Sequence, residues 1–360
     1  MLVYSRVMKR LNTQRLVLLF LLPGAAFALA GETVIAENVT SSCAVSSQLL
    51  IYSEGDSVYA YDPSVQEPVA WSLDLDPAAT GWAGTGEIRK LDAAGGTVLV
   101  LLDLQPPVEE MYGMAIPSPV GVVCCGTDGT GARLVALTRA SAVESIELLP
   151  EGDWVAGKGF SRSAPDADRY LDYVTGEMAF ELLPECNLVS ASGGQRHNLS
   201  QLDLSLPHAW CPYYPRVLLQ GDAPMVLSLD TAAPAVDSVF TLGENYPGID
   251  VHTWVTRNAL TASYHGTRGL IFTDGRFAPL AQPGLRILLW FTDDSYIFTD
   301  DGGTSYRHGL IDWSTFETSA APPQPGLGAY VGNGIRVIPD APTMLLHLRD
   351  GTLRLIELTG

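Results

Sequence analysis

Two pairs of neighbouring aspartates are the residues best placed to bind a metal ion. Asp293 and Asp294 precede Asp300 and Asp301 by a few residues. Ca²⁺ takes about six to eight oxygen ligands, and clustered carboxylates could supply several of them. The other interpretation is that these aspartates are hydrated turn residues in an acidic chain. The sequence therefore predicts no cofactor, with calcium as the alternative.

The cysteines could form disulfides if the chain reaches an oxidising compartment. There are five in total. Cys186 and Cys211 bracket a polar stretch with little periodicity, so we expect a disulfide between them, which removes roughly 3 kcal/mol of unfolded-state entropy in the loop-closure model. Cys124 and Cys125 could form a strained vicinal disulfide, or one of them could pair with Cys43. The alternative for the vicinal pair is one core thiol and one outward thiol on a strand, because successive side chains point to opposite faces.

Catalytic motifs give no further candidate residue. The six histidines are scattered, without the spacing of a metal site. A glycoside hydrolase needs two carboxylates about 5 to 9 Å apart, and the sequence does not say which of its carboxylates converge. We therefore name no catalytic residue, and the sequence favours a protein that is not an enzyme.

Residues 1–30 have the features of a signal peptide. Basic residues precede a short apolar core at Leu16 to Leu22, and Ala28-Leu29-Ala30 fits the small-x-small cleavage pattern. The core is shorter than the stretch of about 18 apolar residues that a membrane anchor needs. We expect cleavage after Ala30, a mature chain that begins at Gly31, and a periplasmic or secreted protein without membrane insertion.

The composition of the 360 residues indicates a folded, acidic protein. Hydrophobic residues make up 47% and charged residues 17%, which excludes intrinsic disorder, collagen and coiled coil. The formal net charge is −19. Phosphate backbones and anionic lipid would repel such a chain, so nucleic acid is excluded as a partner.

Short strands separated by tight turns recur along the chain. The first unit contains Leu49 to Ser53, Ser57 to Asp62 and Pro68 to Leu73, with turn residues between them. Later units repeat it, and further expected strands include Val120–Cys125, Arg133–Arg139, Arg216–Gln220, Met225–Asp230, Val236–Leu242, Ser295–Thr299, Ser305–Asp312 and Met344–Leu348. A period of roughly 40 to 45 residues with four strands is typical of a propeller blade.

The predicted fold class is therefore all-β. We expect a single β-propeller domain at residues 31–360, made of about seven four-stranded blades, with a disulfide-stapled excursion at residues 186–211. The alternative architecture is a pair of β-sandwiches.

The chain resembles the broad β-propeller superfamily, with its Asp-box, quinoprotein and WD40-like members, and no specific family within it. Thr299 to Tyr306 fits the Asp-box pattern, Ser/Thr-x-Asp-x-Gly-x-Thr/Ser-aromatic. The resemblance implies structural roles. Asp301 would accept hydrogen bonds from turn N–H groups, Gly303 would adopt a positive φ, and Tyr306 would pack under the turn.

A second resemblance concerns the vicinal cysteines. Quinone-dependent alcohol dehydrogenases, which are also propellers, place a vicinal disulfide against their cofactor. Cys124-Cys125 resembles that feature in the dipeptide alone, and the repeated tryptophan docking motifs of those enzymes are missing from this sequence.

Two classes of function follow from these observations. The first is a non-catalytic scaffold that binds a protein or cell-envelope component on one face of the propeller. Its anchors would be aromatic residues of the loops between strands: Trp82, Trp210, Tyr213 and Tyr214. The second is an enzyme that uses the central funnel, either a glycoside hydrolase or a quinone-dependent oxidoreductase. The missing catalytic motif favours the scaffold.

Overall fold

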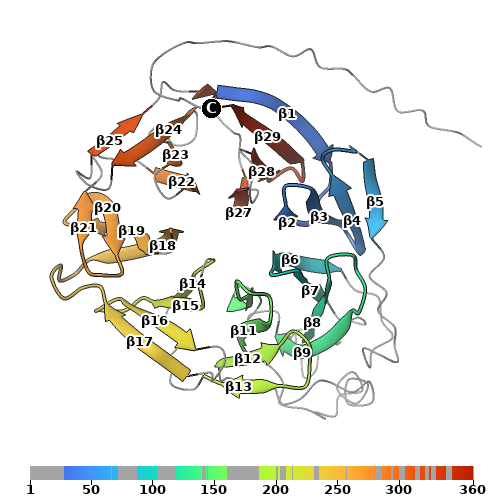
Figure 1. The fold of residues 1–360 in the computed structure, drawn as a ribbon, viewed down its shortest axis with the longest axis horizontal. Coiled ribbons are helices and arrows are strands. Elements are labelled where there is room, and N and C mark those ends of the chain that lie inside the picture. The colour runs from blue at the N-terminus through green and yellow to red at the C-terminus, as the bar shows by residue number, and fades with distance from the viewer. Residues whose placement is uncertain are drawn as a thin grey trace, which may run out of the picture.

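A computed structural model describes residues 28–65, 67–71, 87–103, 119–139, 143, 145–159, 186–199, 202, 208–212, 214–230, 235–256, 258–279, 286–292, 295–299, 305–312, 317–320, 324–325, 330–337 and 343–359. The regular elements in these ranges are all β-strands, which form seven antiparallel sheets. Figure 1 shows the sheets arranged as a ring around a central axis. The expected all-β propeller of about seven blades is confirmed. In the described ranges, no helix is long and apolar enough to span a membrane.

Six blades take their strands consecutively from the chain, beginning near the axis and ending at the rim (Figure 1). The first three blades contain β2 (Ser41–Ser46), β3 (Leu49–Glu54), β4 (Ser57–Asp62) and β5 (Glu67–Trp71); β6 (Ile88–Ala94), β7 (Thr97–Asp103), β8 (Pro119–Gly126) and β9 (Arg133–Arg139); and β10 (Glu147–Leu148), β11 (Trp154–Lys158), β12 (Cys186–Ser190) and β13 (Arg196–Asn198).

The next three blades follow the same order. They contain β14 (His208–Trp210), β15 (Arg216–Leu219), β16 (Met225–Asp230) and β17 (Ala235–Thr241); β18 (Asp250–Thr256), β19 (Ala259–Tyr264), β20 (Thr267–Phe272) and β21 (Phe277–Pro279); and β22 (Arg286–Thr292), β23 (Ser295–Thr299), β24 (Ser305–Asp312) and β25 (Glu317–Ala320). The short strand β26 (Gln324–Pro325) pairs with β24.

The seventh blade closes the ring with strands from both ends of the chain. It contains β27 (Tyr330–Val337), β28 (Thr343–Leu348), β29 (Leu353–Thr359) and, beside β29, the N-terminal strand β1 (Ala28–Ala36). Arg354 Nη1 donates a hydrogen bond to Glu32 Oε1 at 2.5 Å across this pair. The buried His347 ring is hydrogen-bonded to the Val39 carbonyl at 2.9 Å, which ties the seventh blade to the connection before β2.

The expected cleavage site lies inside the closing strand, because Ala28–Ala30 is the start of β1. A chain that begins at Gly31 still contains the partners of five register pairs, from Gly31 opposite Glu357 to Ala36 opposite Leu353. Cleavage after Ala30 would therefore shorten the closing strand without removing it.

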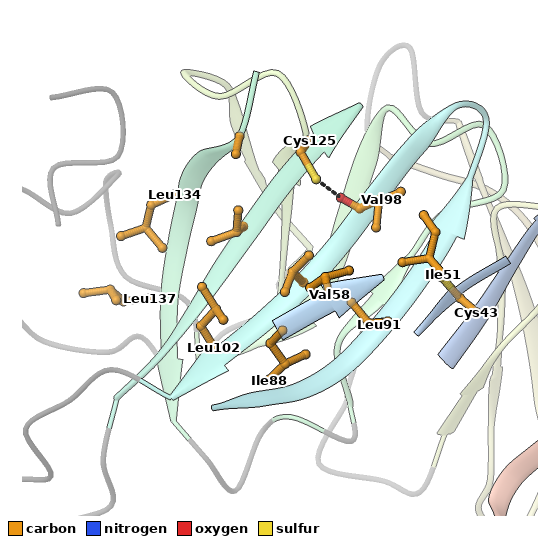
Figure 2. Packing of buried hydrophobic residues seen from close by; sticks show 13 residues of the cluster. Cys43, Ile51, Val58, Ile88, Leu91, Val98, Leu102, Cys125, Leu134 and Leu137 are labelled. Atoms are coloured by element: carbon orange, nitrogen blue, oxygen red, sulfur yellow. Dashed lines mark hydrogen bonds between the residues drawn. The ribbon is translucent and has the colours of Figure 1, made fainter. Parts of the chain in front are cut away.

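The core consists of apolar layers between neighbouring blades. Val98, Val100 and Leu102 of β7 pack in the layer shared with the first blade, shown in Figure 2. Leu99 and Leu101 point the other way, into the layer shared with the third blade. Because both faces of the strand are covered, its sequence is continuously apolar instead of alternating.

The vicinal cysteines of β8 show the same two-sided burial. Cys125 lies in the layer of Figure 2, where its Sγ contacts the Val98 carbonyl oxygen at 3.6 Å. Cys124 lies in the layer on the other side of the strand. Both are thiols. The interpretation of one core thiol and one outward thiol is corrected, because each face of β8 packs against a neighbouring blade.

The structure does not support the disulfide expected between Cys186 and Cys211. Cys211 is a buried thiol in the layer between the fourth and fifth blades. Cys186 begins β12 of the third blade, which packs on the opposite face of the fourth. The expected excursion at 186–211 is also corrected, because it holds β12 and β13 of the third blade and β14 of the fourth.

Aspartates fix several turns by accepting hydrogen bonds from the residue two positions later. Asp62 Oδ1 accepts from the Ser64 N–H at 2.8 Å and from the Ser64 hydroxyl at 2.6 Å. Asp128 accepts the same pair of bonds from Thr130 at 3.0 and 2.7 Å. These hydrogen bonds lower the pKa of both carboxyls, because they favour the ionised form.

Candidate functional site

The aspartates and the Asp-box residues expected from the sequence lie largely outside the described residues. This is so for Asp293, Asp294, Asp300, Asp301 and Gly303. Tyr306 lies in β24, where its backbone pairs with Gln324 of β26. Within the part of the chain that the structure describes, no group of His, Cys, Asp or Glu could hold a metal ion. Calcium binding stays a prediction.

The aromatic anchors have different environments. Trp82 and Tyr213 lie outside the described residues. Tyr214 is 38% exposed, and the Arg216 guanidinium lies 5.2 Å from the centroid of its ring. Trp210 lies in β14 and is partly buried against the core layer between the third and fourth blades. Its buried indole N–H has no hydrogen-bond partner in the structure.

A polar pocket of about 470 Å³ lies between the second and third blades. Four connections surround it: those between β6 and β7, β8 and β9, β10 and β11, and β12 and β13. We call it the turn pocket. Its lining includes Thr97, Arg133, Asp153, Ser192 and Gln195, which supply hydroxyl, guanidinium, carboxylate and amide groups. Its volume falls in the range of small-ligand sites, about 300 to 1,000 Å³.

Backbone contact between two of these turns holds the pocket rigid. Gly95 and Gly152 both have positive φ, at 54° and 76°. A Cβ on Gly95 would overlap the Glu151 carbonyl, and a Cβ on Gly152 would overlap the Ala94 carbonyl. The two turns can approach this closely only because neither residue has a side chain.

Arg133 links the two blades across the turn pocket. Its Nη1 donates a hydrogen bond to the Ser192 carbonyl oxygen, and its side-chain stem lies beside Gly193. The Nη1 amino group of the guanidinium is therefore bound by the protein itself. A guanidinium carries about five N–H donors, so others remain for a ligand. Asp153 on the same lining can accept hydrogen bonds. The turn pocket can thus both donate to and accept from a polar ligand.

The thiols at this site are poor nucleophiles. Cys124 and Cys125 both line the turn pocket. Burial, with a smaller contribution from the Asp128 carboxylate, raises the pKa of Cys125 to about 12. Burial also raises the pKa of Cys124 strongly, against a smaller opposing effect of Arg133. Because the thiolate is the reactive form, the site does not support cysteine catalysis.

We predict that these two thiols resist alkylation in the folded protein. With a pKa of about 12 for Cys125, roughly one molecule in ten thousand carries its thiolate at pH 8. Iodoacetamide at pH 8, followed by mass spectrometry of the peptide containing Cys124 and Cys125, should show little modification in the native protein and complete modification in guanidinium chloride. Alkylation of the native protein as fast as of the unfolded chain would contradict the burial.

Comparisons with known proteins identify the fold. No protein-family model and no curated protein sequence matches this chain. The β-propeller domain of Cps50 (Swd1) from Myceliophteria thermophila is similar in structure, with a TM-score of 0.52 and 11% identity, over 92% of this chain and 100% of that one. A chain of the mitotic checkpoint complex gives a TM-score of 0.47 and 9% identity, over 96% of this chain and 100% of its own length. At 11% identity, the similarity to the Cps50 (Swd1) domain shows the β-propeller fold alone.

Proposed function

We propose that this protein is an exported binding protein whose turn pocket receives a polar segment of a protein or cell-envelope partner. The observation that carries the proposal is the pocket itself: about 470 Å³, lined by donors and acceptors, and held by two blades whose turns touch through glycine backbones. Rigid turns reduce the ordering cost of binding. The raised thiol pKa values at the same site favour recognition over chemistry.

Photo-crosslinking tests the binding role. A benzoylphenylalanine in place of Gln195, which is exposed and lines the turn pocket, should capture a partner in cells that produce the protein. The matched control has the same group in place of Asp222, which is exposed in the connection between β15 and β16. That connection lies at the other ends of the strands, so it should give no adduct.

A second variant separates specific capture from chance proximity. Adding Arg133→Ala to the Gln195-labelled chain should abolish the adduct, because it removes the cation of the pocket. Equal adducts from both labelled positions, or an adduct that survives Arg133→Ala, would rule out the turn pocket as the binding site. Thermal melting of each chain controls for folding.

Export is proposed from the N-terminal sequence. The apolar core at residues 16–22 and the pattern Ala28-Leu29-Ala30 support cleavage after Ala30, in a periplasmic or secreted location. Edman sequencing of the protein recovered outside the cytoplasm should begin at Gly31. Recovered protein that still contains residues 16–22 would contradict the proposal.

A further inference from the structure

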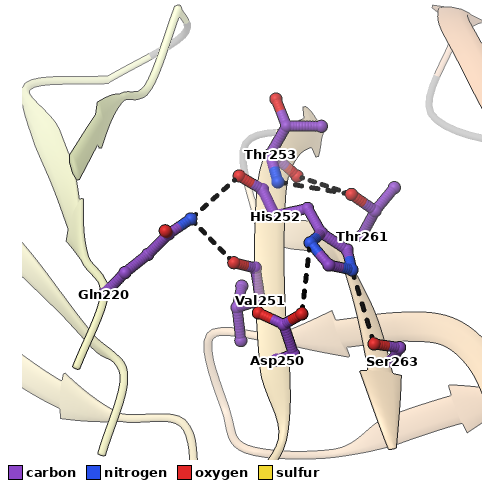
Figure 3. A network of polar contacts seen from close by, with 7 residues as sticks. All are labelled: Gln220, Asp250, Val251, His252, Thr253, Thr261 and Ser263. Atoms are coloured by element: carbon purple, nitrogen blue, oxygen red, sulfur yellow. Dashed lines mark hydrogen bonds and ion pairs between the residues drawn. The ribbon is translucent and has the colours of Figure 1, made fainter. Parts of the chain in front are cut away.

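A serine, a histidine and an aspartate lie on one face of the fifth blade, near the axis (Figure 3). Asp250 and His252 are two residues apart on β18, so their side chains leave the same face. Ser263 on β19 is the register partner of Asp250. His252 Nδ1 lies 3.8 Å from Asp250 Oδ2, and His252 Nε2 lies 3.4 Å from Ser263 Oγ. We call these three residues the serine site.

The two ring nitrogens of His252 face two chemically different partners. A carboxylate beside Nδ1 favours the tautomer that carries the proton on Nδ1. The lone pair of Nε2 then faces the Ser263 hydroxyl and can accept its proton. This is the division of roles between orienting carboxylate, base and nucleophile in serine acyl transfer, which geometry identifies regardless of fold.

Hydrogen bonds from a neighbouring blade hold the backbone beneath the serine site. Gln220, directly after β15 of the fourth blade, donates through Nε2 to the carbonyl oxygens of Val251 and His252 at 2.8 and 3.4 Å (Figure 3). Val251 and Ala262 are buried in the layer beneath. The strand pair is therefore anchored on its other face, and the histidine backbone has a fixed position.

We propose that Ser263 is the nucleophile of a surface site that cleaves activated esters. Ser263 Oγ attacks the ester carbonyl carbon while its proton passes to His252 Nε2. The carbon–oxygen bond to the leaving group breaks, the leaving group departs as a phenolate with the electron pair, and His252 releases its proton to solvent. Water then attacks the acyl-serine carbonyl carbon while His252 Nε2 takes a proton from that water. The bond from the acyl carbon to Ser263 Oγ breaks, His252 returns the proton to Oγ, and the carboxylic acid and free serine are restored.

The exposure of the serine site defines the substrates it can cleave. The side chains of His252 and Asp250 are 48% and 72% exposed, so substrate can reach the imidazole and water screens its pairing with the carboxylate. The Nε2–Oγ distance must also shorten from 3.4 Å toward about 3 Å when substrate binds. Such a site suits esters of acidic phenols, whose leaving groups need no protonation, and not amides.

Hydrolysis of p-nitrophenyl acetate tests the proposal on the full-length protein. We expect Ser263→Ala and His252→Ala each to lower kcat/KM at least about tenfold. Asp250→Asn should lower it less, because its carboxylate is screened. The matched control is His265→Asn, since His265 is a second exposed imidazole nearby and asparagine tolerates its φ of 48°. That variant should hydrolyse the ester at the wild-type rate.

Covalent labelling identifies the nucleophile directly. A biotinylated fluorophosphonate should modify Ser263, as read by mass spectrometry, and the label should be lost in His252→Ala. Wild-type hydrolysis in Ser263→Ala, or no label on Ser263, would overturn the proposal. Loss of ester hydrolysis in His252→Ala but not in Ser263→Ala would also overturn it, because the His252 imidazole acting without the serine would then explain the rate. Unchanged melting temperatures confirm that the variants are folded.

Discussion

Gly152→Ala should lower the melting temperature well beyond the effect of an ordinary surface substitution. Gly152 has a φ of 76°, and a Cβ there would overlap the Ala94 carbonyl of the second blade. The left-handed conformation costs about 1–2 kcal/mol for alanine, and forcing the turns apart costs about 1–3 kcal/mol more. The sum of about 2–5 kcal/mol should be visible in differential scanning calorimetry.

Gly96→Ala is the matched control for this prediction. Gly96 lies in the turn that faces Gly152 and has a φ of 84°, but a Cβ there meets nothing within 4 Å. Only the conformational cost of about 1–2 kcal/mol applies. Gly95→Ala should behave like Gly152→Ala, because its Cβ would overlap the Glu151 carbonyl. Equal melting temperatures for Gly96→Ala and Gly152→Ala would show that the two turns are not in backbone contact.

A chain that begins at Glu37 should be far less stable than one that begins at Gly31. The shorter chain lacks β1, so β29 stays paired with β28 on one side but loses its partner on the other and becomes an exposed edge. The chain from Gly31 keeps five of the seven register pairs of β1. At about 1 kcal/mol per hydrogen bond, the difference is on the order of 5 kcal/mol, to which the lost packing of Ile35 adds.

Two measurements check the closing strand. Thermal unfolding should separate the two chains by about 10 °C or more. Size-exclusion chromatography should show self-association of the shorter chain, because its open edge can pair with another copy. Equal melting temperatures for the two chains, with both eluting as monomers, would show that β1 does not hold the ring closed.

The blade repeat could be predicted because many strands are bounded by turn residues. Met225–Asp230, Ser295–Thr299 and Ser305–Asp312 were expected from the sequence and are strands with those bounds. The first two are short runs rich in apolar or β-branched residues, and each of the three has glycine, proline or aspartate nearby. The local signal and the tertiary structure agree for these strands.

The inner strand β18 could not be predicted in the same way. β18 carries Asp250 and His252 on one face, so its sequence looks like a polar loop. Its apolar residues Val251 and Trp254 are three positions apart because the register shifts between them, which breaks the alternation. The histidines therefore seemed scattered, and the partners of His252 became visible only when β18 was paired with β19.

The turn pocket depends on distances that a sequence does not contain. Arg133 and Ser192 are 59 residues apart and meet because the second and third blades are neighbours in the ring. The same ring explains the failed disulfide. Cys186 and Cys211 are close in sequence, but they belong to blades whose shared layer does not include Cys211.

The closing strand pair also determines how the ring would respond to force. The start of β1 and the end of β29 lie at the same end of one antiparallel pair: Ala28 is opposite Thr359, and Gly31, the first residue after the proposed cleavage, is opposite Glu357. Tension applied between the start of β1 and the end of β29 would act on the hydrogen bonds of one register pair at a time. The strands would separate by unzipping, instead of by shearing of all their hydrogen bonds together. The ring should therefore open at low force, and the six blades made of consecutive strands should unfold only after the closing pair has separated.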